Sequence, residues 1–152
     1  MPERSHTKSF PGSGSGRTPA LRQLISTLRS PGSEVWLADP AEHHHDLADH
    51  LDRHGAGIPG AIGLLEAADA LIRQRQEAGL AQNESVPEPL VRVLVDDLPA
   101  ILDQPQVAEV LLRILRTGRK AGVLENVLAE PGTDSFPGHP GLRAAFTRPR
   151  TR

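Results

Sequence analysis

The chain has 152 residues, enough for one modest domain, and 38% of them are hydrophobic but only 3% aromatic, so its core must be aliphatic. A net charge of −2 excludes a uniformly basic nucleic-acid-binding surface, and the absence of cysteine excludes disulfides and thiolate metal sites. No apolar run approaches the ~20 residues that span a bilayer, and residues 1–9 lack the apolar segment of a secretory signal. We therefore expect a cytoplasmic protein that does not itself insert into a membrane, although other chains could link it to a membrane complex.

The pattern of apolar residues predicts helices and strands in alternation. Residues 1–10 lack periodicity and are expected to be disordered, residues 41–57 are weakly patterned, and the tail from Pro131 is expected to be mostly irregular. Helical periodicity occurs in three stretches: 21–28, 59–77 and 107–115. Short apolar runs typical of buried strands occur at 35–38, 90–95 and 123–128. This alternation predicts an α/β sandwich with a mainly parallel sheet.

A glycine-rich turn stands directly before the first predicted helix. Such a turn lets backbone N–H groups surround phosphate oxygens, and the helix N-terminus adds its positive dipole end. The motif that does this best is G-x-x-x-x-G-K-[ST], in which the Lys binds phosphates and the hydroxyl holds Mg²⁺. Here Gly16 and Thr18 match, but Pro11 replaces the first Gly and Arg17 replaces the Lys. Taken alone, such a run is more often a flexible linker.

The strand predicted at 90–95 ends in two carboxylates, Asp96 and Asp97. In P-loop ATPases an acid at this place binds Mg²⁺, and a neighbouring acid orients or deprotonates the attacking water. Asp96 suits the first role and Asp97 the second, although Asp97 is one methylene shorter than Glu. The alternative is an ordinary strand end with solvated carboxylates.

The order and spacing of these elements resemble the motor domain of the FtsK/SpoIIIE family of DNA translocases, over residues 9 to about 146. The segments that carry the resemblance are GSGSGRTPALRQLI, SEVWLADP, AIGLLEAADALIRQRQEAG, LVRVLVDDLPAILDQPQVAEVLLRILRTGRKAGV and TDSFPGHPGLRAAF. In that order they are similar to the family's phosphate loop, its second strand, the helix before Walker B, Walker B with a later Gly-Arg turn, and the segment after the sensor strand. The resemblance implies a RecA-like P-loop sandwich, incomplete here, over residues 11–146, with a basic tail at 147–152.

The resemblance also implies a function, namely ATP hydrolysis with Mg²⁺ coupled to the movement of DNA, or of protein, through a ring of subunits. It assigns phosphate binding to Gly12, Ser13, Gly14, Ser15, Gly16, Arg17 and Thr18. It assigns Mg²⁺ to Thr18 and Asp96, and water positioning to Asp97. Arg119 of the Gly-Arg turn would act on a neighbouring subunit's nucleotide. The alternative for Arg119 is a basic side chain favoured by the dipole at a helix C-terminus.

Some positions depart from the family's pattern. The polar segment HTKSF stands where the family has a buried strand, which we expect in the middle of the sheet, where polar side chains are costly. Glu130 stands near the place of a γ-phosphate-sensing Gln, and an acid there would repel phosphate. These departures favour an alternative function, a catalytically inactive remnant that binds partner motor subunits without hydrolysing ATP.

A histidine-rich segment offers a third possibility, a small metal-binding module. His50 and His54, at i and i+4, could share a helix face and bind Zn²⁺, with Asp46 and Asp49 as oxygen ligands and His43–His45 nearby. The alternative is a solvated loop. Four arginines near the C-terminus are expected to form a frayed basic tail that could touch phosphates nonspecifically: Arg143, Arg148, Arg150 and Arg152.

Overall fold

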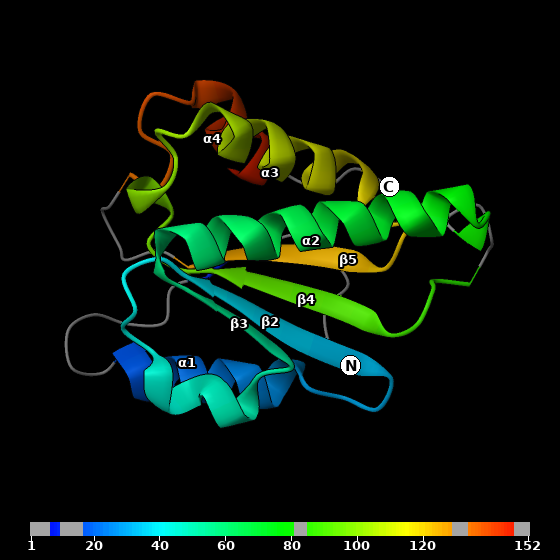
Figure 1. Ribbon diagram of the computed structural model, residues 1–152, viewed down its shortest axis with the longest axis horizontal. Helices are drawn as coiled ribbons and strands as arrows, with labels where there is room; N and C mark the ends of the chain where they lie inside the picture. The colour runs from blue at the N-terminus through cyan, green and yellow to red at the C-terminus, as the bar shows by residue number, and fades with distance from the viewer. Residues whose placement is uncertain (1–6, 10–16, 81–84, 129–133, 148–152) are drawn as a thin grey trace.

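The computed structural model describes residues 7–9, 17–80, 85–128 and 134–147 (Figure 1). The elements, in which η marks a 3-10 helix, are β1 (Thr7–Ser9), α1 (Arg17–Leu28), β2 (Ser33–Asp39), η2 (His45–His50), β3 (Arg53–Ala56), α2 (Gly57–Glu77), β4 (Leu90–Val95), η4 (Leu98–Ala100), α3 (Pro105–Thr117), β5 (Val123–Leu128) and α4 (Pro140–Thr147). The strands form one parallel sheet in the order β1-β5-β4-β2-β3. The predicted α/β sandwich with a parallel sheet is confirmed.

Strand β4 lies in the middle of this sheet, and all six of its residues are buried. Val91, Val93 and Val95 belong to a core cluster with α2 and α3, whereas Leu94 belongs to a second cluster with α1. A parallel strand that helices cover on both faces needs an almost continuous apolar run, and LVRVLV supplies one. The sequence signal was strong here because the strand is buried on both sides.

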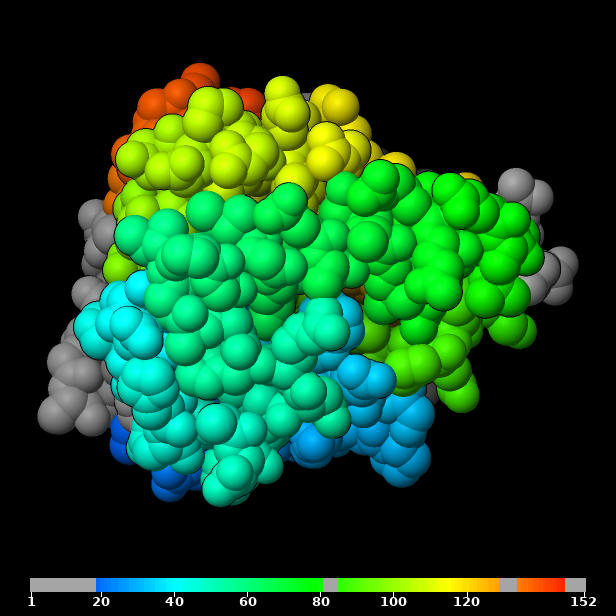
Figure 2. Space-filling model, viewed as in Figure 1, coloured from blue at the N-terminus to red at the C-terminus, as the bar shows by residue number. Residues whose placement is uncertain are grey.

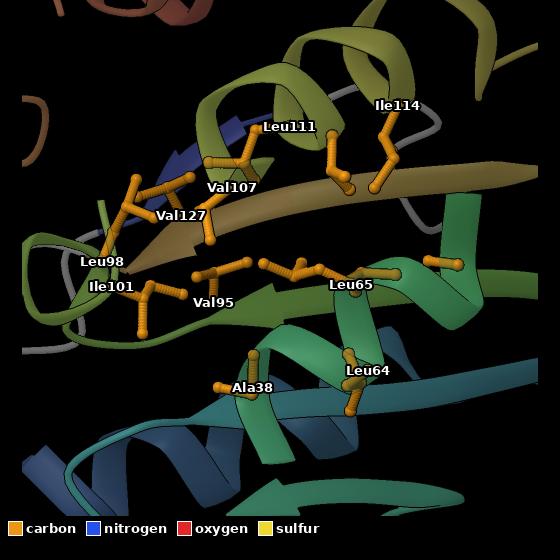
Figure 3. Close-up of a cluster of buried hydrophobic side chains, with 14 of the residues drawn as sticks. Ala38, Leu64, Leu65, Val95, Leu98, Ile101, Val107, Leu111, Ile114 and Val127 are labelled. Atoms are coloured by element: carbon orange, nitrogen blue, oxygen red, sulfur yellow. The ribbon is translucent and has the colours of Figure 1, made fainter. Parts of the chain in front are cut away.

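Helices α2 and α3 lie side by side and cover one face of the sheet (Figure 2). Figure 3 shows their apolar side chains directed at β4 and β5, among them Leu65 from α2 and Leu111 and Ile114 from α3. Burying one such side chain completely stabilises the fold by about 1.5–3 kcal/mol. Helix α1 lies on the opposite face (Figure 1), where its residues at i, i+4 and i+7 are buried. These residues are Leu21, Ile25 and Leu28. The fold is therefore a three-layer sandwich.

The amino end of the sheet, where the strands begin, is held by Arg75 of α2. Its buried guanidinium donates to the carbonyl oxygens of Ala121 at 2.7 Å and of Pro89 at 2.8 Å, just before β5 and β4. Burial lowers the pKa of Arg75, and the charge of Glu34 opposes that effect. One side chain thus ties the starts of two neighbouring strands to the helix above them.

The sequence missed strand β3, which lies in the stretch described as weakly patterned. RHGA is too short to show alternation, and it becomes a strand because it pairs with β2 along its whole length. Gly55 is required there, since a Cβ atom would lie 2.3 Å from the carbonyl oxygen of Gly60. This close approach allows α2 to start directly beside the strand.

The two ends of the chain also differ from expectation. Thr7–Ser9, part of the segment expected to be disordered, form β1, and this strand lies at one margin of the described sheet rather than in its middle. Within the tail expected to be irregular, Pro140 begins helix α4, where a proline is tolerated in the first turn. Arg143 of that helix pairs with Asp134 at 2.6 Å and is not part of a frayed tail. Arg148, Arg150 and Arg152 lie outside the described residues. None of the helices in the described ranges is long and apolar enough to cross a bilayer.

Candidate functional site at the carboxyl end of the sheet

Two acidic residues meet at the carboxyl end of the sheet, where the parallel strands end. Ala38 of β2 pairs with Val95 of β4, and the N–H of Asp96 donates to the Ala38 carbonyl at 3.0 Å. Asp39, the last residue of β2, and Asp96, directly after β4, therefore lie at the same level, and both are 0% exposed. In open parallel α/β sheets, ligands bind at this end of the strands.

Asp39 shapes the segment that follows β2. Its carboxylate accepts hydrogen bonds from the backbone N–H groups of His43 and His44, each at 3.0 Å, and from His54 Nε2 at 3.0 Å. Glu42 adopts the left-handed conformation, with φ of 57°, which turns the chain back toward the strand end. These bonds place the His44 side chain over the end of β4.

His44 contacts Asp96 directly. The distance from His44 Nε2 to Asp96 Oδ2 is 2.7 Å, and the two side chains are 1% and 0% exposed. Because an ionised carboxylate only accepts hydrogen bonds, Nε2 is the donor when Asp96 is ionised. Asp39, His44 and Asp96 form a group, called here the buried triad, whose ligand atoms lie within 4.8 Å of one another.

Asp97 has the left-handed conformation, with φ of 47° and ψ of 49°, and it stands directly before η4. Its carbonyl accepts the N–H of Ala100 at 3.0 Å, so the chain leaves the strand in a tight turn. Aspartate tolerates this conformation better than most residues. Asp97 is half-buried, next to Asp96 at the carboxyl end. Of the two carboxylates, the structure thus buries the predicted Mg²⁺ ligand Asp96 completely and the predicted catalytic residue Asp97 only in part.

The predicted phosphate loop stands between β1 and α1 in the sequence. Strand β1 ends at Ser9, which is paired with Leu128, and Val127 is paired in turn with Val95 of β4. Residues 10–16, with the predicted contacts of Gly12 to Gly16, lie outside the described residues, and only the backbone of Arg17 and Thr18 is described, at the start of α1. The chain enters this segment at the carboxyl end of the sheet, the end at which Asp96 lies.

Arg119 lies at the other end of the sheet from Asp96. It is exposed in the turn between α3 and β5, where Gly118 and Gly122 flank it. Both glycines are required by the backbone, since a Cβ atom on Gly118 would lie 2.4 Å from the Val123 carbonyl oxygen and one on Gly122 would lie 2.6 Å from that of Pro87. Arg119 therefore cannot reach Asp96 of its own chain. Glu130, which was compared with a sensor glutamine, lies outside the described residues.

The possibility that His50 and His54 form a zinc pair on one helix face does not hold. His50 belongs to η2 and His54 to β3, so the two histidines do not share a helix face. Asp46 pairs with Arg22 at 3.6 Å on the surface. Sequence reasoning missed Asp39 as a member of the site and missed that His44 reaches Asp96, 52 residues further along the chain. The sequence did hold one signal for this site, because an aspartate stands at the end of each of two predicted strands.

The solved structures that are similar to this fold include two proteins described as ATPases and a conjugation coupling protein. A protein described as an ATPase has a TM-score of 0.60 at 18% sequence identity, and the match covers 93% of this chain and 62% of that one. EccC (ATPases 2 and 3) of Thermomonospora curvata, in complex with a signal sequence peptide, has a TM-score of 0.65 at 16% identity, covering 92% of this chain and 26% of that one. The pCW3 conjugation coupling protein TcpA, in its monomer form with ATPγS, has a TM-score of 0.57 at 16% identity, and the match covers 88% of this chain and 45% of that one.

The chain thus spans less than two thirds of the length of each of these structures. No family model and no curated protein sequence matches it. Two of these neighbours are described as ATPases and the third was solved with ATPγS, and the likeness supports the resemblance seen in the sequence at the level of the fold alone. The chain has an α/β fold that matches part of a P-loop ATPase.

Proposed function

We propose that this chain is a nucleotide-binding domain of the FtsK/SpoIIIE motor type, which hydrolyses ATP within a ring of subunits and moves DNA. The observation that carries the proposal is the position of Asp96, at the carboxyl end of the central strand and at the end of the sheet where the glycine-rich segment follows β1. Two structural neighbours are described as ATPases, and a third was solved with ATPγS, which supports the proposal.

The residues at this end of the sheet suit Mg²⁺ and phosphate by their chemistry. Mg²⁺ prefers oxygen ligands, and a carboxylate has about four acceptor positions, so the hydrogen bond to His44 does not exhaust Asp96. In the proposed role Asp96 and Thr18 hold Mg²⁺, the backbone from Gly12 to Gly16 and Arg17 hold the phosphates, and Asp97 orients water. Bound ATP would supply the phosphoryl group.

A second candidate, the inactive remnant that binds partner motor subunits, is favoured by one specific contact. His44 Nε2 lies 2.7 Å from Asp96 Oδ2 in a fully buried position, so the carboxylate that would bind Mg²⁺ already has a hydrogen-bond partner. Replacement of the lysine by Arg17 acts in the same direction, because a planar guanidinium does not substitute for a compact ammonium.

Calorimetric titration of the purified chain with Mg·ATP tests the proposal. We expect binding that Asp96→Asn weakens at least about tenfold, equivalent to about 1.4 kcal/mol. The control Asp103→Asn removes an exposed carboxylate near the same end and should change affinity less than about twofold. Binding by a Pro11→Gly, Arg17→Lys variant but not by the natural chain would support the remnant. Absence of binding by both proteins would contradict the proposal, and DNA-stimulated turnover tests the motor function separately.

A further inference from the structure

The buried triad has the composition of a transition-metal site. It presents one imidazole nitrogen and two carboxylates, with the ligand atoms within 4.8 Å of one another and all three residues buried. Buried charges in proteins are paired with opposite charges or coordinate metal ions. We infer that Asp39, His44 and Asp96 bind one first-row divalent transition-metal ion, with Zn²⁺ as the reference ion, and that this binding needs no nucleotide.

The charges of the three side chains match a divalent ion. Two ionised carboxylates and a neutral imidazole carry a total charge of −2, which one M²⁺ ion neutralises. The hydrogen bond between His44 and Asp96 compensates only the Asp96 carboxylate. Asp39 relies on His54 and on two backbone N–H groups. A single metal ion would neutralise the negative charge of both carboxylates.

The type of ligand separates this site from a magnesium site. Mg²⁺ is bound almost entirely by oxygen, whereas imidazole nitrogen suits Zn²⁺, Ni²⁺, Cu²⁺ and iron. The triad shares Asp96 with the proposed nucleotide site but adds His44 and Asp39, which that function does not use. The inference therefore does not rest on the proposed function.

The surroundings of Asp39 are those of a carboxylate that is held in a fixed orientation. The N–H groups of His43 and His44 and the ring of His54 all donate to it, and metal-bound carboxylates are typically oriented by such hydrogen bonds. Three donors leave part of its acceptor capacity available. His54 is 11% exposed in its side chain and would support the site without binding the ion.

The distances require a small adjustment. Ligand atoms of one tetrahedral zinc ion lie about 3.4 Å apart, given bonds of about 2.0–2.1 Å. His44 Nε2 and Asp96 Oδ2 lie closer than this, at 2.7 Å, and the widest separation in the triad is within 4.8 Å. The metal would replace the hydrogen bond, with His44 moving away from Asp96. His44 lies in the loop before η2, whereas Asp39 ends β2 and Asp96 directly follows β4, so the loop is the part that moves.

The test is titration of the full chain with Zn²⁺ in the presence of excess Mg²⁺ and without nucleotide, measured by calorimetry. We expect one equivalent to bind, and His44→Asn and Asp39→Asn each to weaken binding at least about tenfold. The matched control is His45→Asn, which removes the next histidine along the chain, exposed on the surface. It should change affinity less than about twofold. Circular dichroism confirms that each variant is folded.

A second measurement uses the unaltered protein, so it does not depend on whether a variant folds. Ring nitrogen resonances of the seven histidines are recorded with and without Zn²⁺ in ¹⁵N-histidine-labelled protein. The inference requires the Nε2 resonance of His44 to show the largest shift. Absence of Zn²⁺ binding, or binding that His45→Asn abolishes while His44→Asn leaves it unchanged, would overturn it. Mg·ATP titration of His44→Asn reports on the nucleotide site independently, because that variant keeps Asp96.

Discussion

Glu125 shows how one buried residue can set the pH dependence of stability. It lies in β5, is 0% exposed, and stands between Val123 and Val127 on the face of the strand that packs against the core beneath α2 and α3. Burial raises the pKa of the Glu125 carboxyl well above its usual value. In the sequence Glu125 only interrupted an apolar run, because nothing local distinguishes a buried glutamate from an exposed one.

The pH dependence follows from linkage. Above the ordinary glutamate pKa of about 4.3 the unfolded chain loses this proton while the folded chain keeps it, so rising pH lowers the free energy of unfolding. Glu125→Gln, which cannot ionise, should escape this loss. We expect its advantage over the natural chain to grow by up to about 1.4 kcal/mol per pH unit from about pH 5 upward. Urea unfolding at several pH values measures it. The control is Glu109→Gln at an exposed position, whose free energy of unfolding should differ from that of the natural chain by the same amount at every pH. A difference for Glu125→Gln that does not change with pH would contradict the argument.

At the scale of elements, the turn between α3 and β5 is specified by backbone geometry. Gly122 has φ of +75°, and a Cβ atom there would lie 2.6 Å from the Pro87 carbonyl oxygen and 2.9 Å from Arg75 Nη1. The turn therefore packs against the chain before β4 and against the side chain that ties both strand starts together. This gives the Gly-Arg-x-x-Gly pattern a structural explanation that does not depend on Arg119.

Two alanine substitutions separate this constraint from the general cost of glycine. Gly122→Ala should lower the free energy of unfolding by more than about 1 kcal/mol, because the left-handed conformation and the contact with Pro87 are both unfavourable for alanine. Gly63→Ala, at an exposed position inside α2 with no atom within 4 Å of the added Cβ, should instead stabilise by about 0.5–1 kcal/mol. Denaturant titration of both variants measures the difference, and equal effects would mean that the turn is not constrained.

At the scale of the whole molecule, the proposed Mg²⁺ ligand Asp96 and the proposed catalytic residue Arg119 lie at opposite ends of the sheet. Asp96 follows β4 at the carboxyl end, and Arg119 is exposed before β5 at the amino end. If the proposed function is correct, Arg119 can act only on the site of a neighbouring subunit, whose carboxyl end faces this amino end.

Mixing variants tests this arrangement. Arg119→Ala should leave Mg·ATP affinity unchanged and lower turnover by at least about a thousandfold, the lower end of the range for an arginine that acts in trans. Mixtures of Arg119→Ala with Asp96→Asn subunits should regain part of the turnover, because an interface can then combine an intact Arg119 with an intact Asp96. Lys120→Ala, which changes the next exposed cation, should have little effect. A mixture as inactive as its components would argue against action in trans.

By itself, the sequence determined the layers of this fold. The run LVRVLV, the helical periodicities of α1, α2 and α3, and the run that became β5 predicted their elements, because each signal is local and each element buries a continuous apolar face. Tertiary structure alone decided which polar residues meet. Asp39, His44 and Asp96 come together only because β2 and β4 are parallel neighbours that end at the same level, and RHGA is a strand only because β2 offers it a partner. Pairing across tens of residues leaves no periodicity in the chain, so side chains that meet through it could not be matched before the sheet order was known.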